Sequence, residues 1–141
     1  MAIPFPRVPA KPGHIRVPAF LPAPVRSRAD GWTVERQAAF LAALAQARSV
    51  AAAARRVGMS REAAYELRRR PGGAHFGDVW DAVLSGQRPR RKLTPEERFR
   101  AASEGMVRPR IWRGEYVGIA RKFNNSALLG LVRRLTRAGA R

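Results

Sequence analysis

Apolar residues follow helical spacing over 33–70 and are separated by residues that start and stop helices. Serine and threonine side chains can accept the first free backbone N–H groups of a helix, whereas glycine and proline end helices. The sequence predicts three helices on this basis: one over 34–47 capped by Thr33, one over 50–57 capped by Ser49 and ended by Gly58, and one capped by Ser60 that reaches about residue 70, before Pro71-Gly72-Gly73.

A stripe of large apolar residues predicts a fourth helix after residue 73. Asp78 and Asp81 fall on the side opposite the stripe, where we expect them to face solvent. The stripe repeats at i, i+3, i+4, i+7 and i+8, the pattern of one buried helix face: Phe76, Val79, Trp80, Val83 and Leu84.

The segment over 94–141 combines helix and strand patterns. The capping box Thr94-Pro95-Glu96-Glu97 predicts a helix to about residue 103. Strand-like apolar residues around Gly114-Glu115 predict a β-hairpin over 107–123, in which we expect Trp112 to pack into a core. A last helix is predicted from Asn124 or Asn125 to about residue 137, with a possible dimer seam: Leu128, Leu131, Val132 and Leu135.

Seven prolines interrupt residues 1–30, so this segment is predicted to be an extended arm. Two arrangements fit its apolar residues: the arm lies on a surface of its own chain or a protein partner, or it is disordered. The chain is thus divided into a Pro-rich basic arm (1–30), a helical domain (31–84), a basic linker (85–93) and a basic C-terminal region (94–141).

The charge balance points to a polyanionic partner. The chain has 28 Lys and Arg against 10 Asp and Glu, a net charge of +18, which attracts nucleic acid and favours counterion release from its backbone. The excess is uneven: +4 over 1–30, +3 over 31–84 and +11 over 85–141.

Composition excludes several kinds of site. The chain has no cysteine and two histidines, so disulfides and thiolate metal sites are excluded. No apolar run approaches the roughly 20 residues of a membrane span, and prolines interrupt any leader-like pattern at the start. We expect no cofactor and no membrane partner, and we expect a cytoplasmic protein.

The segment from Ser49 to Arg69 has the spacing of two helices that cross through a tight turn. Ala54 is small where the helices approach, Gly58 can adopt positive φ, and Ala64 and Leu67 can enter a shared core. This spacing resembles that of helix-turn-helix DNA-binding proteins. The resemblance implies a mainly α fold: a homeodomain-like tri-helical unit and a fourth helix, followed by a helix, a β-hairpin and a helix.

Two narrower resemblances concern larger parts of the chain. The run from Ser49 through Tyr65 to Trp80 is similar to the N-terminal domain of phage terminase small subunits and related transposon-borne modules. Gly31-Trp32-Thr33 and Arg113-Gly114-Glu115-Tyr116-Val117-Gly118 are similar to motifs in small alphaproteobacterial helix-turn-helix proteins. Both resemblances imply double-stranded DNA as the partner.

The third helix supplies the candidate base and phosphate contacts. Its N-terminal end enters the major groove in this motif, where Arg61 would bind guanine, Glu62 would accept from cytosine, and Tyr65 would reach a phosphate or a thymine methyl. The full candidate set is Ser60, Arg61, Glu62, Tyr65, Arg68 and Arg69. The alternative for Glu66 and Arg69 is an ion pair on the helix surface.

Basic residues outside this helix are candidates for phosphate or minor-groove contacts: Arg90, Arg91, Lys92, Arg108, Arg110, Arg113, Arg121 and Lys122. The alternative is a solvated hairpin that covers the last helix.

Catalysis is not expected, because the acids of the fourth helix have no predicted histidine or third carboxylate beside them. The favoured function is a transcriptional regulator, and the C-terminal helix is the candidate surface for a homodimer. A packaging adaptor of the terminase small-subunit kind and a basic RNA-associated protein are the alternatives.

Overall fold

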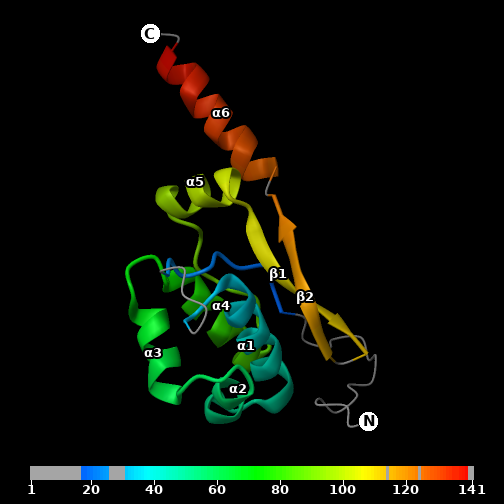
Figure 1. Cartoon of the computed structure of the whole chain (residues 1–141). Coiled ribbons are helices and arrows are strands. Elements are labelled where there is room, and N and C mark those ends of the chain that lie inside the picture. Colours follow the sequence, from blue (N-terminus) through cyan, green and yellow to red (C-terminus); the bar gives the residue numbers. More distant parts are fainter. Residues whose placement is uncertain (1–16, 26–30, 114, 124, 140–141) are drawn as a thin grey trace.

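The computed structural model describes residues 17–25, 31–113, 115–123 and 125–139, and this part of the chain is mainly helical with one antiparallel hairpin (Figure 1). The elements are α1 (Val34–Ala47), α2 (Val50–Arg56), α3 (Arg61–Arg69), α4 (Ala74–Ser85), α5 (Pro95–Ser103), β1 (Met106–Trp112), β2 (Glu115–Lys122) and α6 (Asn125–Gly139). The predicted order of helices and strands is confirmed.

The predicted N-caps start their helices. Each cap side chain accepts a backbone N–H of the first turn: Thr33 from Arg36 at 3.1 Å, Ser49 from Ala52 at 3.3 Å, Ser60 from Ala63 at 3.1 Å, and Thr94 from Glu97 at 3.2 Å. Glu97 also accepts from the Thr94 N–H at 2.8 Å, which completes the capping box.

A cluster of aromatic rings forms the centre of the helical body. Phe40 of α1 lies 5.0 Å from Trp80 and 6.1 Å from Phe76 of α4, measured between ring centroids, and Trp32 packs edge-on against Phe40 at 5.6 Å. Helix α1 contacts α2, α4 and both strands, while α3 contacts α2 and α4. Because aromatic side chains bury large areas, this cluster fills the centre of the core. Helix α3 lies on the outside of it.

Residues 17–25 of the predicted arm are docked on the body, which decides between the two arrangements for this stretch. Phe20 is fully buried and forms a bridge with Val107 of β1, with two backbone hydrogen bonds of 2.8 Å. Gly72 has φ +82°, and a side chain at this position would lie 2.8 Å from the Pro24 ring. Residues 1–16 and 26–30 of the arm lie outside the described residues.

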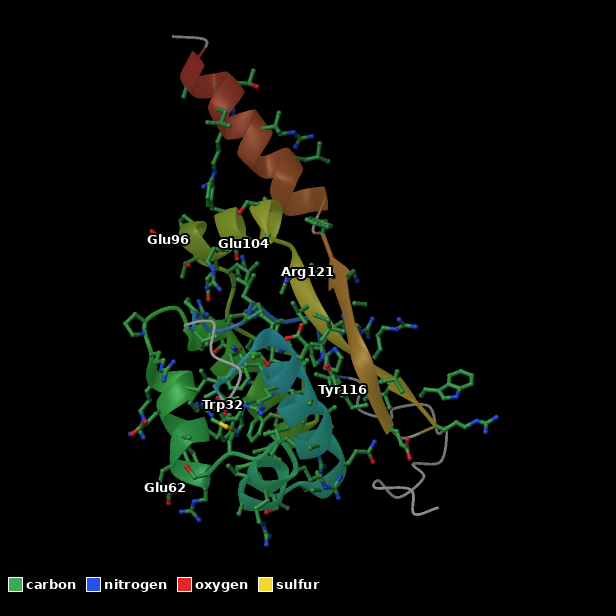
Figure 2. The ribbon with its side chains drawn as sticks, viewed as in Figure 1. Trp32, Glu62, Glu96, Glu104, Tyr116 and Arg121 are labelled. Atoms are coloured by element: carbon green, nitrogen blue, oxygen red, sulfur yellow. The ribbon has the colours of Figure 1, made fainter. Side chains whose placement is uncertain are left out.

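The hairpin packs on α1, and Tyr116, labelled in Figure 2, lies on the side of the hairpin that faces this helix. Val107 pairs with Arg121 and Pro109 with Ile119, and this face turns toward the core. The register shifts between Arg110 and Ile111. The expectation that Trp112 packs into a core is wrong, because strand alternation places it on the face opposite Val107 and Pro109, and the residue is 66% exposed.

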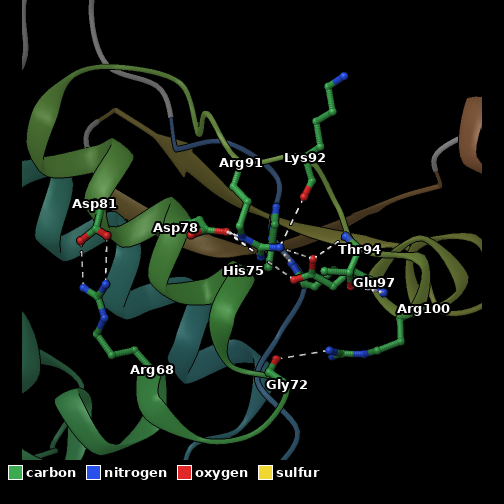
Figure 3. Close-up of polar contacts among 11 residues, drawn as sticks. Arg68, Gly72, His75, Asp78, Asp81, Arg91, Lys92, Thr94, Glu97 and Arg100 are labelled. Atoms are coloured by element: carbon green, nitrogen blue, oxygen red, sulfur yellow. Dashed lines mark hydrogen bonds and ion pairs between the residues drawn. The ribbon is translucent and has the colours of Figure 1, made fainter.

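The C-terminal part is joined to the body by an arginine. Arg91 donates to Asp78 of α4 at 2.8 Å and to both carboxylate oxygens of Glu97 of α5 at 2.8 and 2.7 Å (Figure 3). The expectation that Asp78 faces solvent is wrong, because this ion pair leaves its side chain only 25% exposed. Contacts therefore cross the predicted linker over 85–93.

Helix α6 contacts α5 and then extends away from the rest of the molecule, at the end opposite α2 (Figure 1). Leu129, Val132 and Leu135 are half or more exposed on it. The hairpin covers α1, which differs from the alternative in which it covers the last helix.

Candidate nucleic-acid interface

A tight turn sets the direction in which α3 leaves α2. Gly58 adopts φ +75°, a conformation that favours glycine, and the N–H of Met59 donates to the Ala54 carbonyl at 2.9 Å. Ala54 is fully buried, as are Ala64 and Leu67 on the inner side of α3. Two small residues at the crossing therefore let the short helices approach closely, while the other side of α3 is left outside the core.

The outer side of α3 carries charged and aromatic groups. Arg61, Glu62, Glu66 and Arg69 are exposed, and Glu62 lies at the outer edge of the molecule in Figure 2. An open hollow of about 460 Å³ lies along this helix, lined by Arg61, Glu62, Tyr65, Glu66, Arg68 and Arg69. Two of the four exposed residues are basic and two are acidic, so their charges cancel. This surface therefore offers both hydrogen-bond donors and acceptors but has little net charge.

Tyr65 is held by a neighbour from α4. Its ring lies 5.1 Å from the Trp80 ring between centroids, yet 37% of the residue stays exposed. The Nε of Arg69 donates to the Tyr65 carbonyl at 3.1 Å, which sets Arg69 along the helix rather than against Glu66. Tyr65 therefore packs against Trp80 and remains partly exposed in the middle of the outer side of α3.

Three members of the predicted base-contact set have hydrogen-bond partners within the chain. The Ser60 hydroxyl caps α3, and Arg69 donates to the Tyr65 carbonyl, as described above. Arg68 forms two 2.9 Å hydrogen bonds with the carboxylate of Asp81 (Figure 3). Its guanidinium also lies 4.9 Å from the centroid of the Trp80 ring. Arg68 thus joins α3 to α4 and is only partly exposed, whereas the other members of the set are exposed: Ser60, Arg61, Glu62, Tyr65 and Arg69.

The linker arginines also have partners inside the chain. Arg90 donates to Gln87 at 2.7 Å, and Arg91 holds the two carboxylates described above. Its hydrogen bonds with Glu97 and Asp78 raise the pKa of Arg91, and the same guanidinium lowers the pKa of Glu97 to about 2. Lys92 is exposed beside them.

The hairpin divides its basic residues between two faces. Successive side chains of a strand alternate, so Arg108 and Arg110 project from the face opposite Val107, and Lys122, which pairs with Met106, shares their face. Arg121 pairs with Val107 on the other face and donates to the Glu104 carbonyl of α5 at 3.2 Å. Three of the predicted phosphate contacts therefore form one basic outer face.

The hairpin tip combines an aromatic ring with a cation. The Arg113 guanidinium lies 5.7 Å from the centroid of the exposed Trp112 ring, and Arg113 has φ 51°. A ring of this exposure presents a flat apolar surface to solvent, which is the kind of surface on which nucleic-acid bases stack.

Three further residues of this region were absent from the predicted set. Trp80 supports Tyr65 and Arg68, Glu66 lines the hollow, and Arg55 is exposed in the last turn of α2. The apolar stripe of α4 shows that Trp80 is buried, but only the tertiary structure shows which α3 side chains rest on it.

The part of the chain that the structure describes contains no group of three or more histidine, cysteine or acidic side chains suited to a metal ion. Within the same residues, every helix is too short or too polar to cross a bilayer. Comparison of the sequence with protein-family models, with curated proteins and with solved structures returns no match.

Proposed function

We propose that this protein binds duplex DNA, with α2, the turn and α3 acting as a homeodomain-like helix-turn-helix and α3 lying in the major groove. The observation that carries the proposal is the outer side of α3, where Arg61, Glu62, Tyr65 and Arg69 stay exposed while Ala64 and Leu67 pack inward. These side chains suit base edges and phosphates, and a helix of this diameter fits the major groove.

The basic outer face of the hairpin supplies phosphate contacts in this proposal. Arg108, Arg110 and Lys122 would follow the backbone while α3 reads bases, because α3 itself has little net charge. A regulator of transcription is the role that fits a helix that reads bases beside a separate basic face that contacts phosphates.

Selection of bound sequences from random duplex DNA tests the proposal. We expect a defined motif a few base pairs long for each α3, and we expect Arg61→Ala and Arg69→Ala to weaken binding to that motif. Arg98→Ala on α5 is the matched control, because it removes an exposed arginine away from α3. Recovery of random sequences, or equal loss in the control, would contradict the proposal.

Binding to single strands is a second candidate function, favoured by the exposed Trp112 ring with its Arg113 neighbour. It corresponds to the RNA-associated alternative. Competition between a duplex and a single strand of equal length separates the two, since stacking on Trp112 requires unpaired bases. Loss of single-strand binding in Trp112→Ala, with duplex binding unchanged, would assign this activity to the hairpin tip.

The oligomeric state separates a regulator from a packaging adaptor. The exposed Leu129, Val132 and Leu135 of α6 support the prediction of a homodimer through this helix. Mass measurement in solution tests it: a monomer or dimer favours the regulator, and a larger ring favours the adaptor.

A further inference from the structure

The docked arm is held by backbone hydrogen bonds as well as by its buried apolar side chains. Ala23 donates to the side chain of Gln37 at 2.8 Å and accepts from it at 3.0 Å, and Arg100 donates to the Pro22 carbonyl. Phe20 bridges to Val107 as described above. These contacts come from α1, α5 and β1, so residues 20–23 lie in a groove built by three elements of the body.

His75 of α4 completes this groove. Its Nδ1 accepts a 2.9 Å hydrogen bond from the backbone N–H of Leu21, and the residue is 6% exposed. An imidazole nitrogen accepts a hydrogen bond only when it carries no proton, so this contact requires neutral His75 with its proton on Nε2. Protonation would place an N–H at Nδ1 against the N–H of Leu21, two donors facing each other.

Charged groups surround the ring from several sides. Burial is the largest influence and lowers the pKa of His75, while Glu97 and Asp78 raise it and Arg91 and Arg100 lower it. Both carboxylates are already paired with Arg91, which lies between them (Figure 3). The negative charges of Glu97 and Asp78 are therefore largely neutralised by Arg91 before His75 takes up a proton.

We propose that His75 is a proton-sensitive latch that holds the arm at Leu21 when neutral and loosens it when protonated. A group whose pKa is lower in the docked form binds protons more strongly in the undocked form. Docking is therefore strongest at a pH above the pKa of the undocked ring and weakens as the pH falls toward the lowered pKa of the docked form. The contacts of Gln37 and Val107 do not titrate, so loosening is centred on Leu21 while Ala23 stays bound.

The bridge between Phe20 and Val107 adjoins this contact, since Phe20 is the residue before Leu21. Its backbone hydrogen bonds do not involve His75, so we expect the bridge to persist when His75 is protonated. The latch is independent of whether α3 binds DNA.

Amide hydrogen exchange followed by NMR tests the latch, with Ala23 as an internal reference. After correction for intrinsic exchange rates, we expect the protection of the Leu21 amide to fall about tenfold relative to Ala23 between pH 7.5 and pH 5, the size expected for one lost hydrogen bond. His75→Asn keeps an acceptor near the Nδ1 position and does not titrate, so its protection ratio should not change with pH. A constant ratio in the original chain, or the same pH dependence in His75→Asn, would overturn the proposal.

A titration of the unaltered chain covers the case in which His75→Asn does not fold. The amide shift of Leu21 should titrate together with the ring nitrogens of His75. His14→Gln identifies the two histidine signals and serves as the control, since His14 is not required by the latch. A Leu21 shift that does not follow the His75 titration would also overturn the proposal.

Discussion

The helical body buries its large apolar side chains, whereas the C-terminal end of the molecule leaves several of them exposed. Phe40, Phe76 and Trp80 of the body are at most 2% exposed, whereas Trp112 and Leu135 are about two thirds exposed. The body therefore contains the centre of the core, to which the docked arm and the inner face of the hairpin add side chains. The hairpin tip and α6 present apolar groups to solvent, which is typical of surfaces that meet a partner.

The two regions also differ in charge. The net charge is +3 over 31–84 and +11 over 85–141. If the chain binds DNA as proposed, the C-terminal region is the stronger source of salt-dependent affinity, because such affinity follows the number of cations that reach phosphates. In the same proposal, the mixed polar groups of α3 on the body provide selectivity. The proposed function thus assigns affinity and selectivity to different parts of one chain.

Truncation of a core ring should have the largest effect on stability. Trp80→Ala removes the side chain that contacts Phe40, Tyr65 and Arg68, and we expect the free energy of unfolding to fall by about 3–5 kcal/mol. Leu135→Ala on α6 should change it by less than about 0.5 kcal/mol. Denaturant unfolding measures both values. Similar losses in the two variants would show that α6 belongs to the folding core.

The ion pair of Arg91 with Glu97, the joint between the two regions, should lose its stabilising effect at acidic pH. The Arg91 guanidinium lowers the pKa of Glu97 from 4.5 to about 2, so the native state prefers the charged carboxylate. The contribution of the charged Glu97 carboxylate to the free energy of unfolding is complete above pH 4.5. It is lost as the pH falls toward 2, which lowers the free energy of unfolding by roughly 2 kcal/mol.

Glu97→Gln is the matched variant for this joint. It keeps an acceptor for the Thr94 N–H and removes the charge, so its stability should fall less than that of the unaltered chain between pH 5 and pH 2. Thermal unfolding across this range measures the difference. Parallel pH curves would show that the ion pair with Arg91 does not stabilise the joint.

The ion pair that joins α3 to α4 should have the smallest effect. Asp81 is 63% exposed, so solvent screens its attraction to Arg68, and Asp81→Asn should lower the free energy of unfolding by less than about 1 kcal/mol. The same measurement on Arg68→Ala adds the loss of contact with Trp80. A larger effect in Asp81→Asn than in Arg68→Ala would contradict this assignment.

Local signals in the sequence were sufficient to predict the secondary structure. Each helix start depends on one side chain and the backbone within three residues of it, as Thr33 and Thr94 show. The tight turn at Gly58 likewise follows from one residue with the conformational freedom it needs. Such interactions are independent of the rest of the fold, so residue spacing is enough to identify them.

Contacts between distant segments were not predictable in this way. Whether residues 17–25 dock depends on Gln37 and His75, two buried polar residues whose side chains form hydrogen bonds with the arm backbone. The partners of Arg68 and Asp78 lie 13 residues away along the chain. The exposure of Trp112 depends on which face of the hairpin packs on α1, a tertiary contact that strand periodicity alone does not reveal.

The division between affinity and selectivity is tested most directly by salt titrations of two variants on a selected duplex and a scrambled one. Arg61→Ala should lose about 1–3 kcal/mol of binding free energy on the selected duplex and little on the scrambled one. The triple variant Arg108→Ala, Arg110→Ala, Lys122→Ala should weaken binding to both duplexes equally, and its salt slope should be smaller by up to about 2.7. Loss of selectivity in the triple variant, with Arg61→Ala unchanged on both duplexes, would contradict the account.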